Sequence, residues 1–234
     1  MDSSLAGLES IFINNTFQSP KLKKLNLDDE VPYSILVKEG NPDDIILYES
    51  KLLKADMIVI GANTKSKMNF LGTTAEKVAH QSHLPILIVK NRVKNPYKNI
   101  LAPTDFGMQS KQSVLFVKSI YPSAKIKALH SSETIYIAGP YTVAGGDFVQ
   151  YNEVAKACAQ KDLKDFMKDL SIQKGKIIDG EANSKKALLK YINKGSYDPV
   201  VVGSRGTAGF NTLLGSVASS ILRETPTDVL VYVP

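Results

Sequence analysis

The stretch Val200-Val201-Val202-Gly203-Ser204-Arg205-Gly206, followed by Leu213-Leu214-Gly215-Ser216, decides the fold of this chain. It has the pattern of a buried strand that runs into a glycine-containing loop, and then of a helix that begins after a second glycine. Glycine lets the backbone approach an anion closely, and a helix N-terminus offers unpaired N–H groups. The order of these parts therefore predicts a phosphate-binding loop between a strand and a helix.

The same pattern occurs earlier in the chain, which indicates a duplicated unit. Met57-Ile58-Val59-Ile60-Gly61 precedes Phe70-Leu71-Gly72-Thr73, and each copy ends in an apolar strand that follows a proline, over 85–89 and 226–231. Three pairs of glycines are 140, 142 and 143 residues apart: Gly40 and Gly180, Gly61 and Gly203, Gly72 and Gly215. A nearly constant offset is typical of an internal repeat. We therefore expect two domains in tandem, over 1–96 and 97–234.

Composition indicates an ordinary globular protein. The 234 residues are 43% hydrophobic and 22% charged, which is usual for a soluble domain. The chain has no apolar run of membrane-spanning length, and no basic flank precedes a signal-like core at Met1-Asp2-Ser3-Ser4. We expect a cytoplasmic protein without a membrane partner.

Charge and ligand-type residues argue against nucleic acid and metal. The net charge is +6, but acidic residues are interspersed among the lysines, so we expect no nucleic-acid partner. Cys158 is the single cysteine and lies on the apolar stripe of a predicted helix, which predicts core packing. The histidines form no ligand set with carboxylates or sulfur, so we expect no metal site.

Strands and helices alternate along the second copy. We predict strands over 99–102, 124–129, 176–178, 199–202 and 229–233, and helices over 109–121, 147–170, 184–193 and 216–224. Apolar strands that alternate with helices form a parallel sheet covered on both faces. The predicted fold class is α/β, a doubly wound five-stranded parallel sheet in two tandem copies, of which the first is incomplete.

The first strand of this copy leads into Pro103-Thr104-Asp105-Phe106. In doubly wound sheets, ligands bind beyond the carboxyl ends of the strands, where the strand order reverses. A carboxylate at Asp105 can accept hydrogen bonds there from a ribose or a base. It can equally cap the turn before the helix at Gln109, because Gly107 follows it. The sequence leaves both roles open.

Four segments together resemble the universal stress protein family: Ile100–Phe106, Leu129-His130, Gly203-x-x-Gly206 and Gly215-Ser216-Val217. The resemblance spans residues 97–234, and residues from about 31 to 90 resemble the C-terminal part of a second such domain. It implies an adenine nucleotide alpha hydrolase-like fold and a stress-response or signalling module that binds ATP, with or without Mg²⁺. In the nucleotide-binding branch, the loop and the Gly-Ser amides contact the phosphates, and the aspartate lies near the adenosine.

Carried onto matching positions, the resemblance implies a set of nucleotide-binding residues and no catalytic residue. Arg205 lies inside the loop, where it either adds positive charge near the phosphates or, as is commoner for an arginine, faces solvent. The predicted binding residues are Pro103, Thr104, Asp105, Ser131, Gly203, Arg205, Gly206, Gly215, Ser216 and Val217.

Both copies depart from the family motif, the first copy more strongly. The family has nine residues between its second and third glycines, whereas this chain has eight, Thr207–Leu214. In the first copy Thr64 replaces the second glycine, and no Pro-Thr-Asp segment precedes Met57. Thr73 and Glu76 have the spacing of a capping box, which explains them without a ligand. We therefore expect ATP only in the second copy.

The first copy is also shorter, with 96 residues against 138. The deficit of 42 matches a strand, a helix and a strand, including the central strand. Ile11-Phe12-Ile13 is a candidate remnant strand. The alternatives are that another chain supplies the missing elements, that they are truncated, or that they lie outside this sequence. We expect the terminal strands, 86–89 and 229–233, to pair as an intrachain pseudo-dimer, a homodimer being the alternative, because unpaired apolar edges promote aggregation.

Three functional classes remain open. The first is a nucleotide-binding module, indicated by the glycines and Asp105. The second is a nucleotide-free dimeric interaction scaffold of the same family. The third is an enzyme, at most a weak ATPase, which needs a base or metal ligand that the sequence does not identify. We expect His130 to be a buried strand-end residue and not a catalytic one.

Overall fold

The computed structural model describes residues 34–62, 71–92, 95–133, 146–180, 183–204 and 214–234, with side chains in the fifth helix described from Asn152 on. The predictions for Ile11–Ile13, Thr64, Arg205 and Gly206 lie outside these residues. The chain divides into two compact units, residues 1–41 and 42–234. Every helix and strand given below belongs to the second unit.

The order of elements agrees with the predicted alternation. The elements are α2 (Pro42–Leu52), β1 (Ile58–Gly61), α3 (Thr73–Gln81), β2 (Ile86–Val89), β3 (Asn99–Pro103), α4 (Met108–Ile120), β4 (Lys125–Ser132), α5 (Gly146–Asp169), β5 (Lys174–Asp179), α6 (Ser184–Lys194), β6 (Pro199–Gly203), α7 (Ser216–Glu224) and β7 (Asp228–Tyr232). Of the helices the structure describes, none combines the length and apolar character that a membrane span requires.

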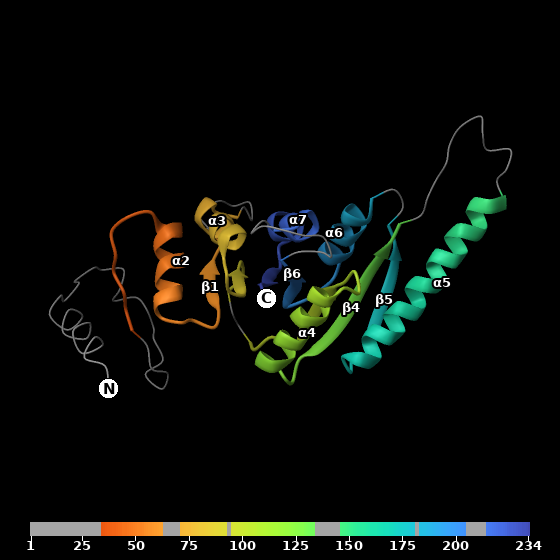
Figure 1. Cartoon of the computed structure of the whole chain (residues 1–234), viewed down its shortest axis with the longest axis horizontal. Helices are drawn as coiled ribbons and strands as arrows, with labels where there is room; N and C mark the ends of the chain where they lie inside the picture. Colours follow the sequence, from red (N-terminus) through yellow and green to blue (C-terminus); the bar gives the residue numbers. More distant parts are fainter. Residues whose placement is uncertain (1–33, 63–70, 93–94, 134–145, 181–182, 205–213) are drawn as a thin grey trace, which may run out of the picture. The chain divides into compact units, whose positions relative to one another are not determined.

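The seven strands form one sheet in the order β1-β2-β7-β6-β3-β4-β5. Figure 1 labels β1, β6, β4 and β5 of this sheet. Within the second copy, strands β3 to β7 are all parallel to one another, and the strand order reverses between β3 and β6. The first copy adds β1 and β2, which are parallel to each other. The α/β fold class is therefore confirmed. The division between residues 96 and 97 stays a prediction.

The two copies meet at an antiparallel pair of strands, as predicted. Strand β2 pairs with β7 in the register Ile86↔Val231, Leu87↔Leu230 and Ile88↔Val229. The sequence offset at this point is 230 − 87 = 143 residues, so Leu87 pairs with its own counterpart and a local two-fold axis passes between them. Because these two strand edges pair within one chain, neither remains open to a second molecule.

The local symmetry extends to the flanking helices. Adding 142 to the bounds of α2 gives those of α6, and adding 143 to the bounds of α3 gives those of α7. The first copy therefore supplies counterparts of α6, β6, α7 and β7. Among the described residues it has no counterpart of β3, α4, β4 or α5.

Side chains alternate between the two faces of the sheet, which gives two core layers. Helices α2, α3, α6 and α7 pack against one face, around Ile86, Val200 and Val229. Helices α4 and α5 pack against the other, around Ile100, Ala128 and Leu230. No described helix of the first copy covers this second face. As a result, Val59 on β1 is 57% exposed.

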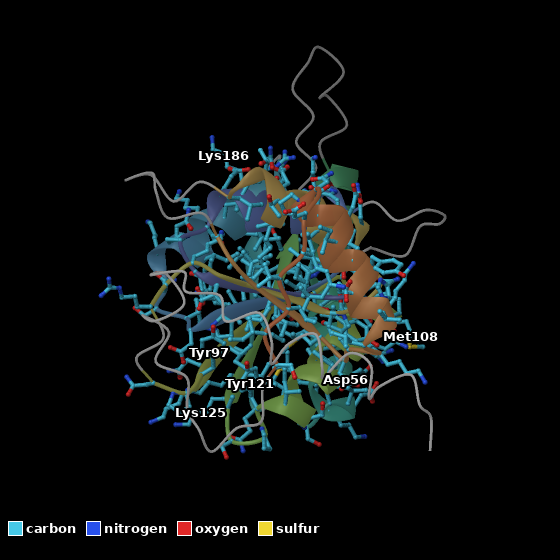
Figure 2. The ribbon with its side chains drawn as sticks, turned by 90° about the vertical axis from the view of Figure 1, so that its left-hand side faces the viewer. Asp56, Tyr97, Met108, Tyr121, Lys125 and Lys186 are labelled. Atoms are coloured by element: carbon cyan, nitrogen blue, oxygen red, sulfur yellow. The ribbon has the colours of Figure 1, made fainter. Side chains whose placement is uncertain are left out.

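A buried carboxylate fixes the segment that joins the copies. Asp228, at the start of β7 and 2% exposed, accepts hydrogen bonds from the backbone N–H groups of Lys90 and Asn91 at 2.7 and 2.9 Å and from the Tyr97 hydroxyl at 2.6 Å. Tyr97 lies beside Tyr121 (Figure 2), with ring centroids 5.3 Å apart. The segment between β2 and β3 is thereby held against β7.

Lys90 links the end of β2 to the last turn of α7. Its ammonium donates to the carbonyls of Leu222 and Thr225, both at 2.6 Å, where a helix leaves its last carbonyls unpaired. Burial lowers the pKa of Lys90 to about 8, and the nearby charge of Asp228 partly opposes this shift. A cation from the first copy therefore caps a helix of the second.

Two predictions from local patterns are wrong. Cys158 is exposed, as is Val154, whereas Leu163 and Phe166 are buried in the same helix. The apolar stripe continues along α5 beyond the part that packs on the sheet. The predicted stripe residues Phe148 and Tyr151 lie outside the described side chains.

The predicted capping box at Thr73 is also absent. The N-cap of α3 is Gly72, with no side-chain cap, so Thr73 is the first helical residue. Glu76 forms an ion pair with Arg223 of α7 instead. This pair joins the two helices that the local two-fold axis relates.

We predict that Asp228→Ala lowers the free energy of unfolding by about 3 kcal/mol, because several buried donors lose their acceptor. The control is Asp198→Ala. Asp198 accepts from two backbone N–H groups, of Lys98 and Asn99, at a more exposed position, and we expect a loss of about 1 kcal/mol. Urea unfolding measures both, and equal losses would contradict a special role for the buried clamp.

Candidate functional site

A cavity of about 560 Å³ lies at the carboxyl ends of β3, β4 and β6, where the strand order reverses. Its lining includes all eight of the predicted binding residues that the structure describes. These are Pro103, Thr104, Asp105, Ser131, Gly203, Gly215, Ser216 and Val217. The structure thus brings together residues that are more than 100 positions apart in the chain.

The cavity also contains residues that the sequence analysis did not assign to it. They are Ser110, Glu133, Ser184, Leu188, Val202 and Ala218, together with His130. Ser110 and Ser184 each lie in the first turn of a helix that follows a strand. This pattern is visible in the sequence and could have predicted that both serines lie at the cavity. Glu133 and Leu188 carry no such signal, because only the packing of α6 and β4 brings them to the cavity.

Asp105 caps the turn after β3 with one of its two oxygens. Its Oδ1 accepts hydrogen bonds from the backbone N–H of Gly107 at 2.9 Å and from the Ser110 hydroxyl at 2.6 Å. The turn-capping role is therefore correct for Oδ1. No group of the described residues donates to Oδ2, and the side chain is exposed at the cavity. Asp105 can thus cap the turn and still accept a hydrogen bond from a ligand.

The next residue, Phe106, has a left-handed backbone conformation with φ of 64°. For a residue with a side chain this conformation is unfavourable by about 1 to 2 kcal/mol. The Phe106 ring packs against the rings of His130 and Phe166, with centroids 4.4 and 5.9 Å apart, and the Phe106 N–H donates to Thr104 Oγ1 at 2.8 Å. Aromatic packing therefore compensates for strain beside the cavity.

His130, on β4, is fixed by the backbone carbonyl of the residue that follows the neighbouring strand β3. Its Nδ1 lies 2.8 Å from the carbonyl oxygen of Thr104, and a carbonyl can only accept. Nδ1 must carry the proton, so Nε2 of the neutral ring is an acceptor. The ring is partly buried and packs on Phe106, in keeping with the expected strand-end position.

Two buried serine hydroxyls near the strand ends have no hydrogen-bond partner. Ser131 and Ser204 are 9% and 7% exposed, and their Oγ atoms are the unsatisfied side-chain atoms among the described residues. Buried polar groups in native proteins are nearly always paired, so an orphan often marks a site for water, an ion or a ligand. Ser131 Oγ belongs to a residue that lines the cavity.

Close packing around Ser131 requires a glycine directly after β5. A Cβ atom at Gly180 would lie 2.6 Å from Ser184 Oγ and 2.8 Å from Ser131 Oγ. These contacts are shorter than van der Waals distances, so a larger residue would displace the serines. Gly180 therefore preserves this wall of the cavity.

Helix α7 points its N-terminus at the cavity. Gly215 is the N-cap and has no side chain that could satisfy the N–H groups of the first turn, and its own N–H donates to the Ser204 carbonyl at 2.8 Å. Ser216, Val217 and Ala218, the first helical residues, all line the cavity. This geometry suits an anion, because the helix dipole and the unpaired N–H groups act together.

The charged side chains of the lining are negative and would repel an anion. Among the described residues, the charged groups at the cavity are the carboxylates of Asp105 and Glu133. An anionic ligand would therefore depend on backbone N–H groups, or on a cation bound with it. Among the described residues, no three His, Cys, Asp or Glu side chains are grouped closely enough to form a metal site of their own.

The first copy has only part of this constellation. Gly61, Gly72 and Thr73 correspond to Gly203, Gly215 and Ser216 by the offsets of 142 and 143. Among the described residues, nothing in the first copy corresponds to Asp105 or Ser131. A Cβ atom at Gly61 would meet no atom within 4 Å, so this glycine is not enforced by close packing.

Comparison with known proteins gives a consistent result. A family model described as the universal stress protein family matches residues 8–90 and 96–233. The stress response protein NhaX of Bacillus subtilis is 36% identical over 56 residues, which are 23% of this chain and 34% of NhaX. The chain thus covers about a third of the length of this curated relative.

Solved structures show the same fold. A putative universal stress protein from Pseudomonas aeruginosa has a TM-score of 0.67 and 15% identity, over 99% of this chain and 78% of its own. A universal stress protein from Archaeoglobus fulgidus has a TM-score of 0.53 and 22% identity, over 82% of this chain and 67% of its own. At these identities the similarity establishes the fold.

The strain at Phe106 can be measured with a matched pair of variants. We predict that Phe106→Gly is more stable than Phe106→Ala by about 1 kcal/mol, because glycine adopts a positive φ without strain and both variants lose the ring. At an ordinary position alanine would be the more stable of the two. Chemical unfolding of the two variants decides the point, and a more stable alanine variant would contradict the left-handed conformation.

Proposed function

The chain belongs to the universal stress protein family, and from that premise we propose that it is a stress-response module that binds ATP in the cavity of its second copy. The observation that carries the proposal is the cavity at the N-terminus of α7, where the lining residue Ser131 has a buried hydroxyl without a hydrogen-bond partner among the described residues. A volume of about 560 Å³ is in the range of small-molecule sites.

The roles follow from the chemistry of the lining. The first turn of α7, with Ser216, would receive the phosphates, because this is where unpaired N–H groups converge. Asp105 Oδ2, Ser131 Oγ and His130 Nε2 are the polar groups on the opposite wall, where a ribose and base would bind. ATP with Mg²⁺ suits the site better than free ATP, since the cation would offset the carboxylates of Asp105 and Glu133.

We propose binding and assign no hydrolytic step. Hydrolysis needs a group that positions or deprotonates the attacking water. Asp105 already accepts two hydrogen bonds at Oδ1, and His130 is held by Thr104 and Phe106. Both groups are arranged to hold a ligand.

A nucleotide-free scaffold is the second candidate, and one observation favours it. The described charged groups of the cavity lining are carboxylates, which repel phosphate. Under this alternative, Ser131 would pair with water, and the surfaces of the joined copies would contact a protein partner.

We predict that Ser216→Ala weakens Mg-ATP binding by tenfold to about a hundredfold, the effect of losing a hydrogen bond to a charged group. Thr73→Ala is the matched control, because Thr73 is the first residue of α3, as Ser216 is of α7. We expect it to bind like the unmodified protein in calorimetric titration. If the unmodified protein binds no Mg-ATP at millimolar concentration, the proposed ATP binding is refuted and the nucleotide-free scaffold becomes the preferred function. A larger loss of Mg-ATP affinity for Thr73→Ala than for Ser216→Ala would mean that the site lies in the first copy and not in the second.

We also predict opposite effects of Ser131→Ala on stability and on affinity. Without ligand the variant should be more stable by about 1 kcal/mol, because it removes an unsatisfied buried hydroxyl. With Mg-ATP it should bind about tenfold more weakly, since the ligand loses a partner. Thermal unfolding with and without nucleotide measures both. A loss of stability with unchanged affinity would mean that this hydroxyl has a purely structural role.

A further inference from the structure

A second cavity, of about 760 Å³, lies on the other side of α6 from the nucleotide cavity. Ser184 and Leu188 of α6 face the nucleotide cavity, whereas three lysines of the same helix line this groove, namely Lys186, Lys190 and Lys194. Lys186 projects to the surface of the molecule (Figure 2). The carboxyl end of β5, from Ile178 to Gly180, forms the opposite wall.

The three lysines form a row of like charge. They are spaced at i, i+4 and i+8, so the row is about 12 Å long, and like charges at this spacing destabilise a helix. The carboxylate among the lining residues is that of Asp179. By the offset of 142, the corresponding residues of α2 are Asp44, Tyr48 and Leu52. The fold therefore does not require lysine at these positions.

Two more lysines converge on the tyrosine at the base of the groove. The Lys127 ammonium donates to the Tyr191 hydroxyl at 2.6 Å, and the ammonium groups of Lys127 and Lys176 lie 5.3 and 5.2 Å from the centroid of the Tyr191 ring. Neither lysine forms an ion pair with a carboxylate of the described residues. Three lysines thus line the groove and two more contact its Tyr191, whereas the carboxylate among the described lining residues is that of Asp179.

The electrostatics at Tyr191 agree with this excess of positive charge. Burial opposes ionisation of the phenol, but hydrogen bonds from Lys127 and Tyr197 and the charges of Lys127 and Lys176 outweigh it and lower the pKa of Tyr191. Burial and the hydrogen bond with Tyr191 raise the pKa of Tyr197, so the effect is local to Tyr191. An anion close to Tyr191 would meet the charges of the same two lysines.

The aromatic rings are arranged in a way that argues against a nucleobase. The rings of Tyr191 and Tyr197 stack with centroids 6.4 Å apart and planes at 25°. A Cβ atom at Gly195 would lie 2.2 Å from the Tyr197 ring, so backbone already packs against that ring. A base could stack only by displacing these groups, whereas single-strand binding proteins present open aromatic faces.

From the row of lysines, the two further ammonium groups that have no carboxylate partner among the described residues, and the occupied ring faces, we propose that this groove binds a linear chain of phosphate groups. Inorganic polyphosphate and the phosphate chain of a free nucleotide share this chemistry. The site is separate from the ATP cavity, and the proposal does not depend on nucleotide binding there.

The test is calorimetric titration with inorganic tripolyphosphate. To remove phosphate binding in the ATP cavity, all proteins carry Ser216→Asp, which places a carboxylate at the first turn of α7. We expect the triple variant Lys186→Gln, Lys190→Gln and Lys194→Gln to bind tripolyphosphate at least about tenfold more weakly. The control triple, Lys156→Gln, Lys161→Gln and Lys164→Gln on the exposed side of α5, changes the net charge equally, from +6 to +3 before Ser216→Asp. It should keep the affinity within about threefold.

Three outcomes would overturn the proposal. They are equal losses in the two triple variants, no binding of tripolyphosphate at millimolar concentration, and tighter binding of single-stranded oligothymidylate than of polyphosphate of equal charge. Binding of adenosine triphosphate as tightly as tripolyphosphate in the Ser216→Asp background would identify free nucleotide as the source of the phosphate chain. Weaker binding would favour inorganic polyphosphate. If Mg-ATP fails to bind the unmodified protein, the ATP site is refuted, but the proposal for this groove is unaffected.

Discussion

The antiparallel pairing of β2 with β7 is the interaction on which the rest of the structure depends. It joins a four-residue strand of the incomplete first copy to the five-stranded sheet of the second, around Leu87 and Leu230, which are 5% and 1% exposed. One core layer then runs across the junction, since residues of both copies belong to it. Two strands and two helices are a small base for independent stability. The first copy therefore depends on this shared core, on the Lys90 cap and on the pair between Glu76 and Arg223.

Much of the fold and of the candidate site is readable in the sequence, because both depend on regular patterns. The glycine offsets predict the duplication, and the bounds of α7 agree with the prediction to the residue. The carboxyl ends of parallel strands meet at one edge of a sheet, so Asp105 and Gly203 could be expected to lie together. The features that escaped prediction depend on distant neighbours. An apolar stripe shows which face of α5 packs on the sheet but not how far along the helix the sheet extends. Cys158 lies beyond that packed part and is exposed for this reason. The unpaired state of Ser131 depends on packing by Gly180 and Ser184, some 50 positions away.

The direction of the strands also separates the two copies functionally. Because β2 runs antiparallel to β7, the carboxyl end of β1 lies at the edge of the sheet opposite to the carboxyl end of β6. The end of β1 at Gly61 therefore lies away from the cavity at Gly203. The first copy can vary in its glycine motif and still support the sheet, since its contribution to the second is a strand edge, a helix cap and an ion pair.

The same junction sets a requirement on biosynthesis. Strand β2 ends at Val89 and its partner β7 begins at Asp228, so the ribosome must add about 140 residues before the pair can form, which takes on the order of 10 seconds. During that time Ile86, Leu87 and Ile88 present an apolar strand edge with no partner from their own chain. On polysomes, neighbouring nascent chains expose the same edge at the same stage. The first copy therefore carries an apolar strand edge that stays unpaired until β7 has been synthesised.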